Sequence, residues 1–315
     1  MASEYVPVRL STLRTGVNLP FDLYIKVSQR YLLYIRNGDD FDSERYRGMK
    51  KKKVRRMFIP PEHEDQYQSF IDAELDSAIN ATDMSASERA SIVTGVAKAA
   101  ILDLELEPDS IKAFQGTEKA VSAMLDVVNG NTDVLKEMMG IDDADEELVV
   151  QSAIKTAGLV LRYAKSQGLS QQNIVNLGVA AMVRDLGKAK IESKYHYLFN
   201  KDHSKFTDDE WKIYKEHPRL SVEIIRDKDY INDQIKEYVL NHEEKLQGSG
   251  FPQGLQQLSA EQEMLCLCNC FDYYHTCLGL SPSEAMKKIT IDELGNFQLE
   301  TINKFKGLLK KENIQ

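Results

Sequence analysis

The hydrophobic pattern at the start of the chain favours strands. Short runs rich in Tyr, Val, Leu and Ile are separated by turn-forming residues such as Asn37–Asp40. These runs are Tyr5–Val8, Phe21–Ile25 and Tyr31–Ile35. We therefore expect a small β-rich N-terminal domain over residues 1–66.

The pattern over residues 67–141 changes to one typical of helices, rich in Ala, Ser, Asp and Glu. Pro60 and Pro61 mark a break before this stretch, and Asn129–Asn131 interrupts it. Nothing in its composition suggests catalysis. We expect a helical connector.

Residues 142–315 carry the clearest helix signals. Gln171–Val183 is apolar on two sides and must be deeply buried. Thr207–Glu210 forms a capping box, and Pro218 suits the first turn of the next helix. The other predicted helices are Glu146–Gln167, Asp233–Glu243, Ser259–Leu278, Pro282–Lys288 and Glu300–Lys311, with Thr207–His217 and Pro218–Arg226 completing the set. The whole pattern predicts a mainly α protein, in which an all-helical domain follows the β-rich domain and the connector.

Composition narrows the function classes. The net charge of −9 argues against binding to a nucleic-acid polymer, which needs clustered positive charge. No apolar stretch approaches the roughly 20 residues that cross a bilayer, so we expect no membrane insertion. The first residues lack the basic and then apolar pattern of a signal peptide. These features predict a cytoplasmic protein.

The four cysteines lie in one segment, at positions 266, 268, 270 and 277. Their spacing of two residues does not bring thiols together on one face of a helix, as a zinc site requires. We interpret them as small buried hydrophobic residues in a reducing compartment.

A basic run covers Lys50–Lys53, Arg55 and Arg56. Such runs are usually solvated loops or strand ends. The alternative is a contact with an anion or with a partner protein, and the sequence leaves both interpretations open.

Candidate chemistry lies at the ends of apolar helices. Asp185 directly follows the most hydrophobic predicted helix, and burial of an unpaired carboxylate is very unfavourable, so Arg184, Lys188 or a bound cation must lie beside it. His217 and His242 end two further predicted helices. A single histidine in such a place is more often a hydrogen-bonded core residue, but two of them together with a buried aspartate indicate a metal site.

Two further pairs of polar residues share helical faces. Asn269 and Asp272 are three positions apart, and Glu147 and Gln151 are four apart. Taken alone, either pair is explained by capping or by surface hydration.

The motifs around these residues resemble those of the HD-GYP family. They are Asp185–Lys188, the segment Leu198–Pro218 and the segment His242–Pro252. Proteins of this family are phosphodiesterases that cleave the bacterial second messenger cyclic di-GMP at a centre of two or three metal ions. The resemblance covers about residues 145–315, and the segment from Val6 to Tyr34 is similar to a small domain that often precedes such units.

The chain also departs from the family pattern. Arg184 stands where the family has the histidine of its His-Asp pair, and Gln151, Glu243 and Asn269 replace other ligands. Phe251 replaces the tyrosine of the Gly-Tyr-Pro signature.

What the resemblance implies is a mixed oxygen and nitrogen site for two metal ions, with iron first and manganese as the alternative. The implied metal-binding residues are Asp185, His217, His242, Glu243, Glu147, Gln151 and Asn269, with Arg184 and Asp272 behind them. Asp185 and Lys188 carry the implied catalytic roles, and Gly250, Phe251 and Pro252 form the implied substrate-binding loop. Arg184 either turns away to pair with an acid such as Glu147 or fills the space of one metal ion.

Three hypotheses follow. The first is a metal-dependent phosphodiesterase of reduced or absent activity on cyclic di-GMP or a related dinucleotide, in which a metal-bridging hydroxide attacks phosphorus. The second is a catalytically poor receptor that keeps its metal centre and signals to a protein partner through the N-terminal domain. The third is a scaffold whose metal is purely structural.

Overall fold

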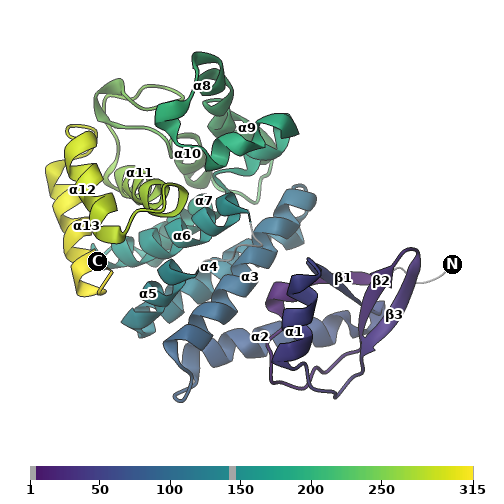
Figure 1. Ribbon diagram of the computed structural model, residues 1–315. Coiled ribbons are helices and arrows are strands. Elements are labelled where there is room, and N and C mark those ends of the chain that lie inside the picture. The colour runs from purple at the N-terminus through teal and green to yellow at the C-terminus, as the bar shows by residue number, and fades with distance from the viewer. Residues whose placement is uncertain (1–4, 142–146, 315) are drawn as a thin grey trace. The chain divides into compact units, whose positions relative to one another are not determined.

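The computed structural model describes residues 5–141 and 147–314 and is shown in Figure 1. Its internal contacts divide the chain into unit 1, Met1–Ala99, and unit 2, Ala100–Gln315. The predicted three-part division at residues 66/67 and 141/142 stays a prediction. Residue 142 and the predicted helix start at Glu146 lie outside the described residues.

Unit 1 contains a four-stranded antiparallel sheet in the order β1-β4-β2-β3. Its strands are β1 (Val6–Arg9), β2 (Leu23–Val27), β3 (Arg30–Ile35) and β4 (Arg56–Ile59). The three strands expected from the apolar runs are therefore confirmed. Strand β4 was not predicted, because it begins inside the basic run, at Arg56.

Three helices complete unit 1 or begin in it. They are α1 (Ser43–Lys51), α2 (Glu64–Asn80) and α3 (Ala86–Leu106). The Asp42 carboxylate accepts the backbone N–H of Arg45 and so caps α1. Phe21 from the sheet domain packs edge-on against Tyr67 and Phe70 of α2, which closes the core over the sheet. The basic run forms the end of α1, a turn and the start of β4, and its side chains beyond Lys50 are exposed or half-buried.

Unit 2 is built on two central buried helices, as Figure 1 shows. These helices are α6 (Leu148–Ser166) and α7 (Gln171–Val183), and α4 (Ile111–Gly130) packs against both. The short α5 (Thr132–Gly140) packs on α6, and Asn131 caps it just after the predicted interruption. The predicted buried helix is confirmed, since all of α7 from Ile174 except Val175 is buried.

The remaining helices lie on either side of this pair (Figure 1). They are α8 (Asp208–Tyr214), α9 (His217–Ile225), α10 (Asp233–Leu240), α11 (Ala260–Asp272), α12 (Pro282–Asp292) and α13 (Leu299–Lys311). Side-chain caps begin several of them: the predicted box of Thr207 and Glu210 starts α8, and Ser259 starts α11. The chain is mainly α, as predicted, and no helix among the described residues is long and apolar enough to cross a membrane.

Two helix ends differ from the prediction in a way that positions the site. Helix α8 stops at Tyr214 and α10 stops at Leu240, each three residues short of the predicted end. His217 therefore lies beyond the end of α8, as the first residue of α9, and His242 lies in the turn after α10. The cause is local, because each imidazole bonds to a carbonyl of the helix that precedes it.

Candidate metal centre and cavity

Each of the two histidines is oriented by a hydrogen bond to the backbone carbonyl three residues earlier. His217 Nδ1 lies 2.7 Å from the carbonyl oxygen of Tyr214, and His242 Nδ1 lies 2.7 Å from that of Val239. A carbonyl oxygen can only accept, so Nδ1 carries the proton in each ring. In the neutral rings the lone pair is then on Nε2, and the two Nε2 atoms face each other at 3.0 Å.

Asp185 completes the cluster from the end of α7. Its Oδ1 lies 3.4 Å from His217 Nε2 and 3.8 Å from His242 Nε2. The turn that follows Asp185 packs tightly on α9, where Gly187 N–H donates to Ser221 Oγ and Ser221 Oγ–H donates to the carbonyl of Arg184. A Cβ on Gly187 would collide with the backbone of His217 and Ser221. The site therefore depends on glycine at this close approach.

The three atoms fit one metal ion. Their mutual distances of 3.0, 3.4 and 3.8 Å place a single point about 2.0 Å from all of them, which is the distance at which divalent transition metals bind imidazole and carboxylate. Two facing lone pairs also repel each other, and a cation between them removes that repulsion. Asp185, His217 and His242 are the group of possible ligands that the described residues bring together in this way.

Burial and charge keep Asp185 and His242 in the protonation states that bind a metal ion. Burial opposes ionisation of Asp185, but Arg184, His217 and His242 outweigh it, so the pKa of Asp185 is lowered. Burial, with the neighbouring His217, lowers the pKa of His242 to about 3. At neutral pH the site thus offers a carboxylate and an unprotonated imidazole without help from a metal.

Two basic side chains lie beside Asp185. Arg184 is almost fully buried, and its Nε forms an ion pair with Asp185 Oδ2 at 3.2 Å. Its other nitrogens donate to the Ala181 carbonyl and to Ser152 Oγ. Lys188 forms its ion pair with Glu147, the exposed residue before α6. Glu147, which the sequence suggested as a partner of Arg184, therefore pairs with Lys188 instead.

The other predicted ligands lie around the cluster and not in it. Glu243 accepts a hydrogen bond from the Tyr214 hydroxyl at 3.1 Å, and Asn269 Nδ2 lies 3.5 Å from the carbonyl oxygen of His242. Asp272, which was expected behind the ligands and not among them, is buried and accepts a hydrogen bond from Thr276. Gln151 is buried within α6.

The predicted substrate-binding loop is anchored by a residue that the sequence argument missed. The buried Glu244 carboxylate accepts three backbone N–H groups, from Gln253 at 2.5 Å, Gly254 at 3.1 Å and Leu255 at 3.0 Å. A Cβ on Gly250 would collide with the backbone of Glu244. The position of Glu244 just before a glycine-rich loop was the sequence signal that could have indicated this role. Pro252, which follows a cis peptide bond, accepts from Arg219 through its carbonyl.

Phe251, from the same loop, packs on an aromatic cluster. Its ring centroid is 6.0 Å from that of Tyr214, 6.1 Å from His217 and 6.4 Å from Trp211. Lys215 lies over its face at 5.6 Å. Phe251 therefore packs edge-on against His217 and also anchors the loop to the aromatic cluster.

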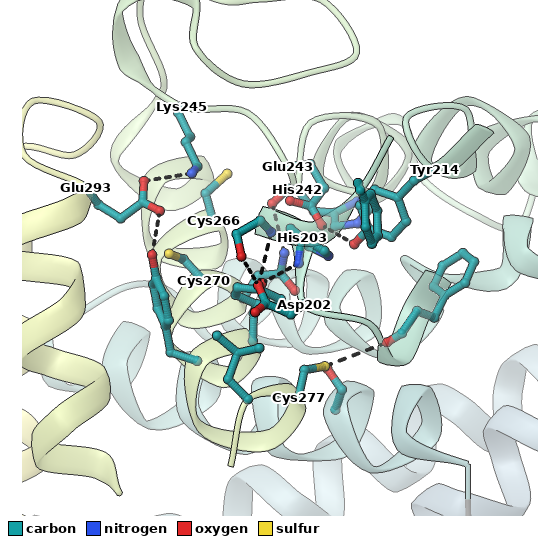
Figure 2. A pocket seen from close by; sticks show the side chains of 18 of the residues that line it. Asp202, His203, Tyr214, His242, Glu243, Lys245, Cys266, Cys270, Cys277 and Glu293 are labelled. Atoms are coloured by element: carbon teal, nitrogen blue, oxygen red, sulfur yellow. Dashed lines mark hydrogen bonds and ion pairs between the residues drawn. The ribbon is translucent and has the colours of Figure 1, made fainter. Parts of the chain in front are cut away.

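A cavity of about 1020 Å³ opens beside the three-residue cluster. Figure 2 shows Tyr214, His242 and Glu243 on one side of it, and Lys245 ion-paired with Glu293 on the other. Its size is at the upper end of small-molecule sites, which range over roughly 300–1,000 Å³. Aromatic side chains line it, including the stacked pair His203 and Tyr273, whose centroids are 4.1 Å apart.

The cavity is also lined by cysteines that the sequence analysis interpreted as buried hydrophobic residues of the core. Cys266, Cys270 and Cys277 line it, and all four cysteines are free. Burial raises the pKa of the Cys266 thiol to about 12, so it stays protonated. The sequence argument had not singled out His203, Tyr273 or Lys245 either. His203 begins a short 3-10 helix, Tyr273 begins the π-helical turn that continues α11, and Lys245 lies in a loop, so the direction of each side chain is defined by the fold.

Comparison with known proteins shows what the chain is similar to. Residues 137–291 match the family model described as the HD domain. Over 180 residues the chain is 26% identical to the cyclic di-GMP phosphodiesterase response regulator RpfG of Xanthomonas campestris pv. campestris, and this match covers 55% of the chain and 46% of the relative. Over 189 residues it is 22% identical to the cyclic di-GMP phosphodiesterase PA4108 of Pseudomonas aeruginosa, covering 58% of the chain and 44% of the relative. The chain thus spans less than half the length of these two relatives.

A solved structure matches nearly the whole chain. It is Bd1817, an HDG"Y"P protein from Bdellovibrio bacteriovorus, with a TM-score of 0.80 and 24% identity. The match covers 98% of this chain and 100% of that one. It shows that the two proteins share a fold.

Proposed function

The chain belongs to the HD-GYP family, and from that premise we propose that unit 2 binds cyclic di-GMP beside a metal ion and hydrolyses it slowly. One observation carries the proposal. Asp185, His217 and His242 converge on a point suited to one ion, at the edge of a cavity large enough for a dinucleotide. The two curated relatives are cyclic di-GMP phosphodiesterases, which supports this substrate.

The donor set supports iron, with manganese as the alternative. Two imidazole nitrogens and a carboxylate oxygen form a mixed site of intermediate hardness. Asp185, His217 and His242 would hold the ion, which would supply Lewis-acid activation of a water molecule and charge neutralisation at a phosphate.

The chain itself supplies binding and positioning. Aromatic faces such as Tyr273 and Trp211 offer stacking surfaces for the guanine bases. Lys205 and Lys288, which also line the cavity, supply positive charge for the phosphates. Lys188, which is ion-paired with Glu147, makes in this proposal a smaller contribution than Arg184 to the lowered pKa of Asp185.

Weak hydrolysis follows from the same geometry. Glu243 turns its carboxylate to Tyr214, and Arg184 occupies the second oxygen of Asp185. Phe251 has no hydroxyl to donate to a phosphate. These features favour the receptor as the second candidate function, and a protein partner for unit 1, with its exposed basic run, is part of that alternative.

The test is direct. Protein loaded with Fe²⁺ or Mn²⁺ is incubated with cyclic di-GMP, and the linear dinucleotide and GMP are separated by chromatography, while calorimetry measures binding. Slow product formation that is lost in His242→Ala supports the enzyme. Binding heat without product supports the receptor, and neither heat nor product overturns both.

A further inference from the structure

We propose that the guanidinium of Arg184 takes the place of a second metal ion, so that unit 2 holds one ion per chain. This inference rests on the proposed metal site and refines it. The expectation of two ions came from the family resemblance, whereas the present proposal comes from how the two oxygens of Asp185 are used.

The Asp185 carboxylate is divided between two partners. Its Oδ1 faces the Nε2 atoms of His217 and His242, while its Oδ2 faces Arg184 Nε at 3.2 Å. A carboxylate that bridges two metal ions offers one oxygen to each. Here the second oxygen already has a cation.

Arg184 cannot easily leave this position. Its side chain is 1% exposed, and its NH1 and NH2 groups donate at 2.6 Å to the Ala181 carbonyl and at 2.7 Å to Ser152 Oγ. The guanidinium stays charged at any physiological pH. Two hydrogen bonds from the terminal nitrogens hold the guanidinium in place, while its Nε lies within ion-pair distance of Asp185 Oδ2 without forming a hydrogen bond to it. Arg184 is therefore a fixed positive charge and not a mobile side chain.

The local charge balance also disfavours a second ion. Asp185 supplies one negative charge to the cluster, and Arg184 matches it before any metal binds. Of the nearby carboxylates, Glu243 accepts a hydrogen bond from Tyr214 at Oε1 and Asp272 accepts one from Thr276 at Oδ1, and neither is in the group of atoms that faces the histidines. A first divalent ion already brings excess positive charge, and a second would be repelled by both that ion and Arg184 at a few ångström.

The experiment measures metal stoichiometry and needs no enzyme activity. The full chain, stripped and then dialysed against Mn²⁺, is analysed by elemental analysis and by electron paramagnetic resonance. We expect one Mn²⁺ per chain with the spectrum of an isolated ion. Arg184→His, which removes the fixed charge and adds a ligand, should bind a second Mn²⁺ and show spin coupling. Arg162→His is the matched control, because Arg162 forms its ion pair with Glu312 away from the cluster, and it should keep one.

Two or more ions in the wild-type chain, or a folded Arg184→His that still binds one, would overturn the inference and leave the proposed function intact. A wild-type chain that binds no ion would overturn the metal site itself. If Arg184→His does not fold, as judged by circular dichroism, Arg184→Gln serves instead. Loss of the repelling charge should tighten its Mn²⁺ binding at least tenfold, and unchanged affinity would contradict the proposal.

Discussion

His217 Nε2 lies 3.0 Å from His242 Nε2, although 25 positions separate the two residues in sequence. Each ring is oriented by a carbonyl three residues earlier, and neither is exposed. The pair is therefore preorganised for a shared ligand, and that arrangement gives the first prediction.

Replacement of either histidine should remove the metal. In His217→Ala and His242→Ala we expect the Mn²⁺ content after dialysis to fall at least tenfold, because two remaining ligands hold a divalent ion weakly. Elemental analysis measures this. His275→Ala is the control, since its imidazole bonds to the Leu280 carbonyl and lies outside the cluster, and a similar loss in that variant would contradict a specific site.

Glu244 should stabilise the loop that carries Phe251. Glu244→Ala leaves three backbone N–H groups without their buried acceptor, and hydrogen bonds to a charged group contribute roughly 1.5–3 kcal/mol each, not additively. We expect the free energy of unfolding in urea to fall by about 3 kcal/mol. Glu243→Ala, which loses one bond from Tyr214, should lose less than half as much. Equal losses would show that the loop does not depend on Glu244.

Gly187 should not tolerate a side chain. Gly187→Ala places a methyl group against the backbone of His217 and Ser221, and overpacking of this kind destabilises by about 1–3 kcal/mol. The melting temperature and the Mn²⁺ content should both fall, because the turn that contains Gly187 holds Asp185 in place. The matched control is Gly307→Ala inside α13, where a Cβ meets nothing within 4 Å. It should stabilise the protein by about 0.5–1 kcal/mol.

Stability should depend on Glu210 in acid. Hydrogen bonds from Lys201, the Thr207 N–H and Tyr197 lower the pKa of Glu210 to about 2. A lowered pKa means that the folded state favours the anion, so this stabilisation is complete above the unfolded value of about 4.3 and is lost as pH falls toward 2. Glu210→Gln should be less stable than the wild type at pH 7, and the gap should narrow from pH 5 downward. Urea unfolding at pH 7, 5 and 3.5 measures it, and a constant gap would contradict the assignment.

Much of the fold could be predicted, because its signals are local. The strands at 5–35 show as apolar runs, and the capping box at Thr207 and the break at Asn131 mark helix ends. Strand β4 could not be predicted because it begins with a charged residue. It forms through its backbone pairing with β1, which is distant in sequence. Helix α10 ends early because His242 bonds to the Val239 carbonyl, an effect of side-chain geometry and not of helix propensity.

One part of the site could be predicted from the sequence, because a buried carboxylate needs a positively charged partner. A carboxylate after an apolar helix required a cation, which pointed to Asp185 and to the two histidines. Which neighbour faces inward could not be read from the sequence. Glu243 and Glu244 are adjacent, yet one turns to Tyr214 and the other to the loop N–H groups, and the turn after α10 decides between them.

The carbonyls of Tyr214 and Val239 have a consequence for how this protein can change over evolutionary time. Because main-chain atoms orient both imidazoles, neighbouring side chains can be exchanged without tilting the rings. A lineage can then exchange the residues around Asp185, His217 and His242 one by one and still keep the three atoms that face one another at the site.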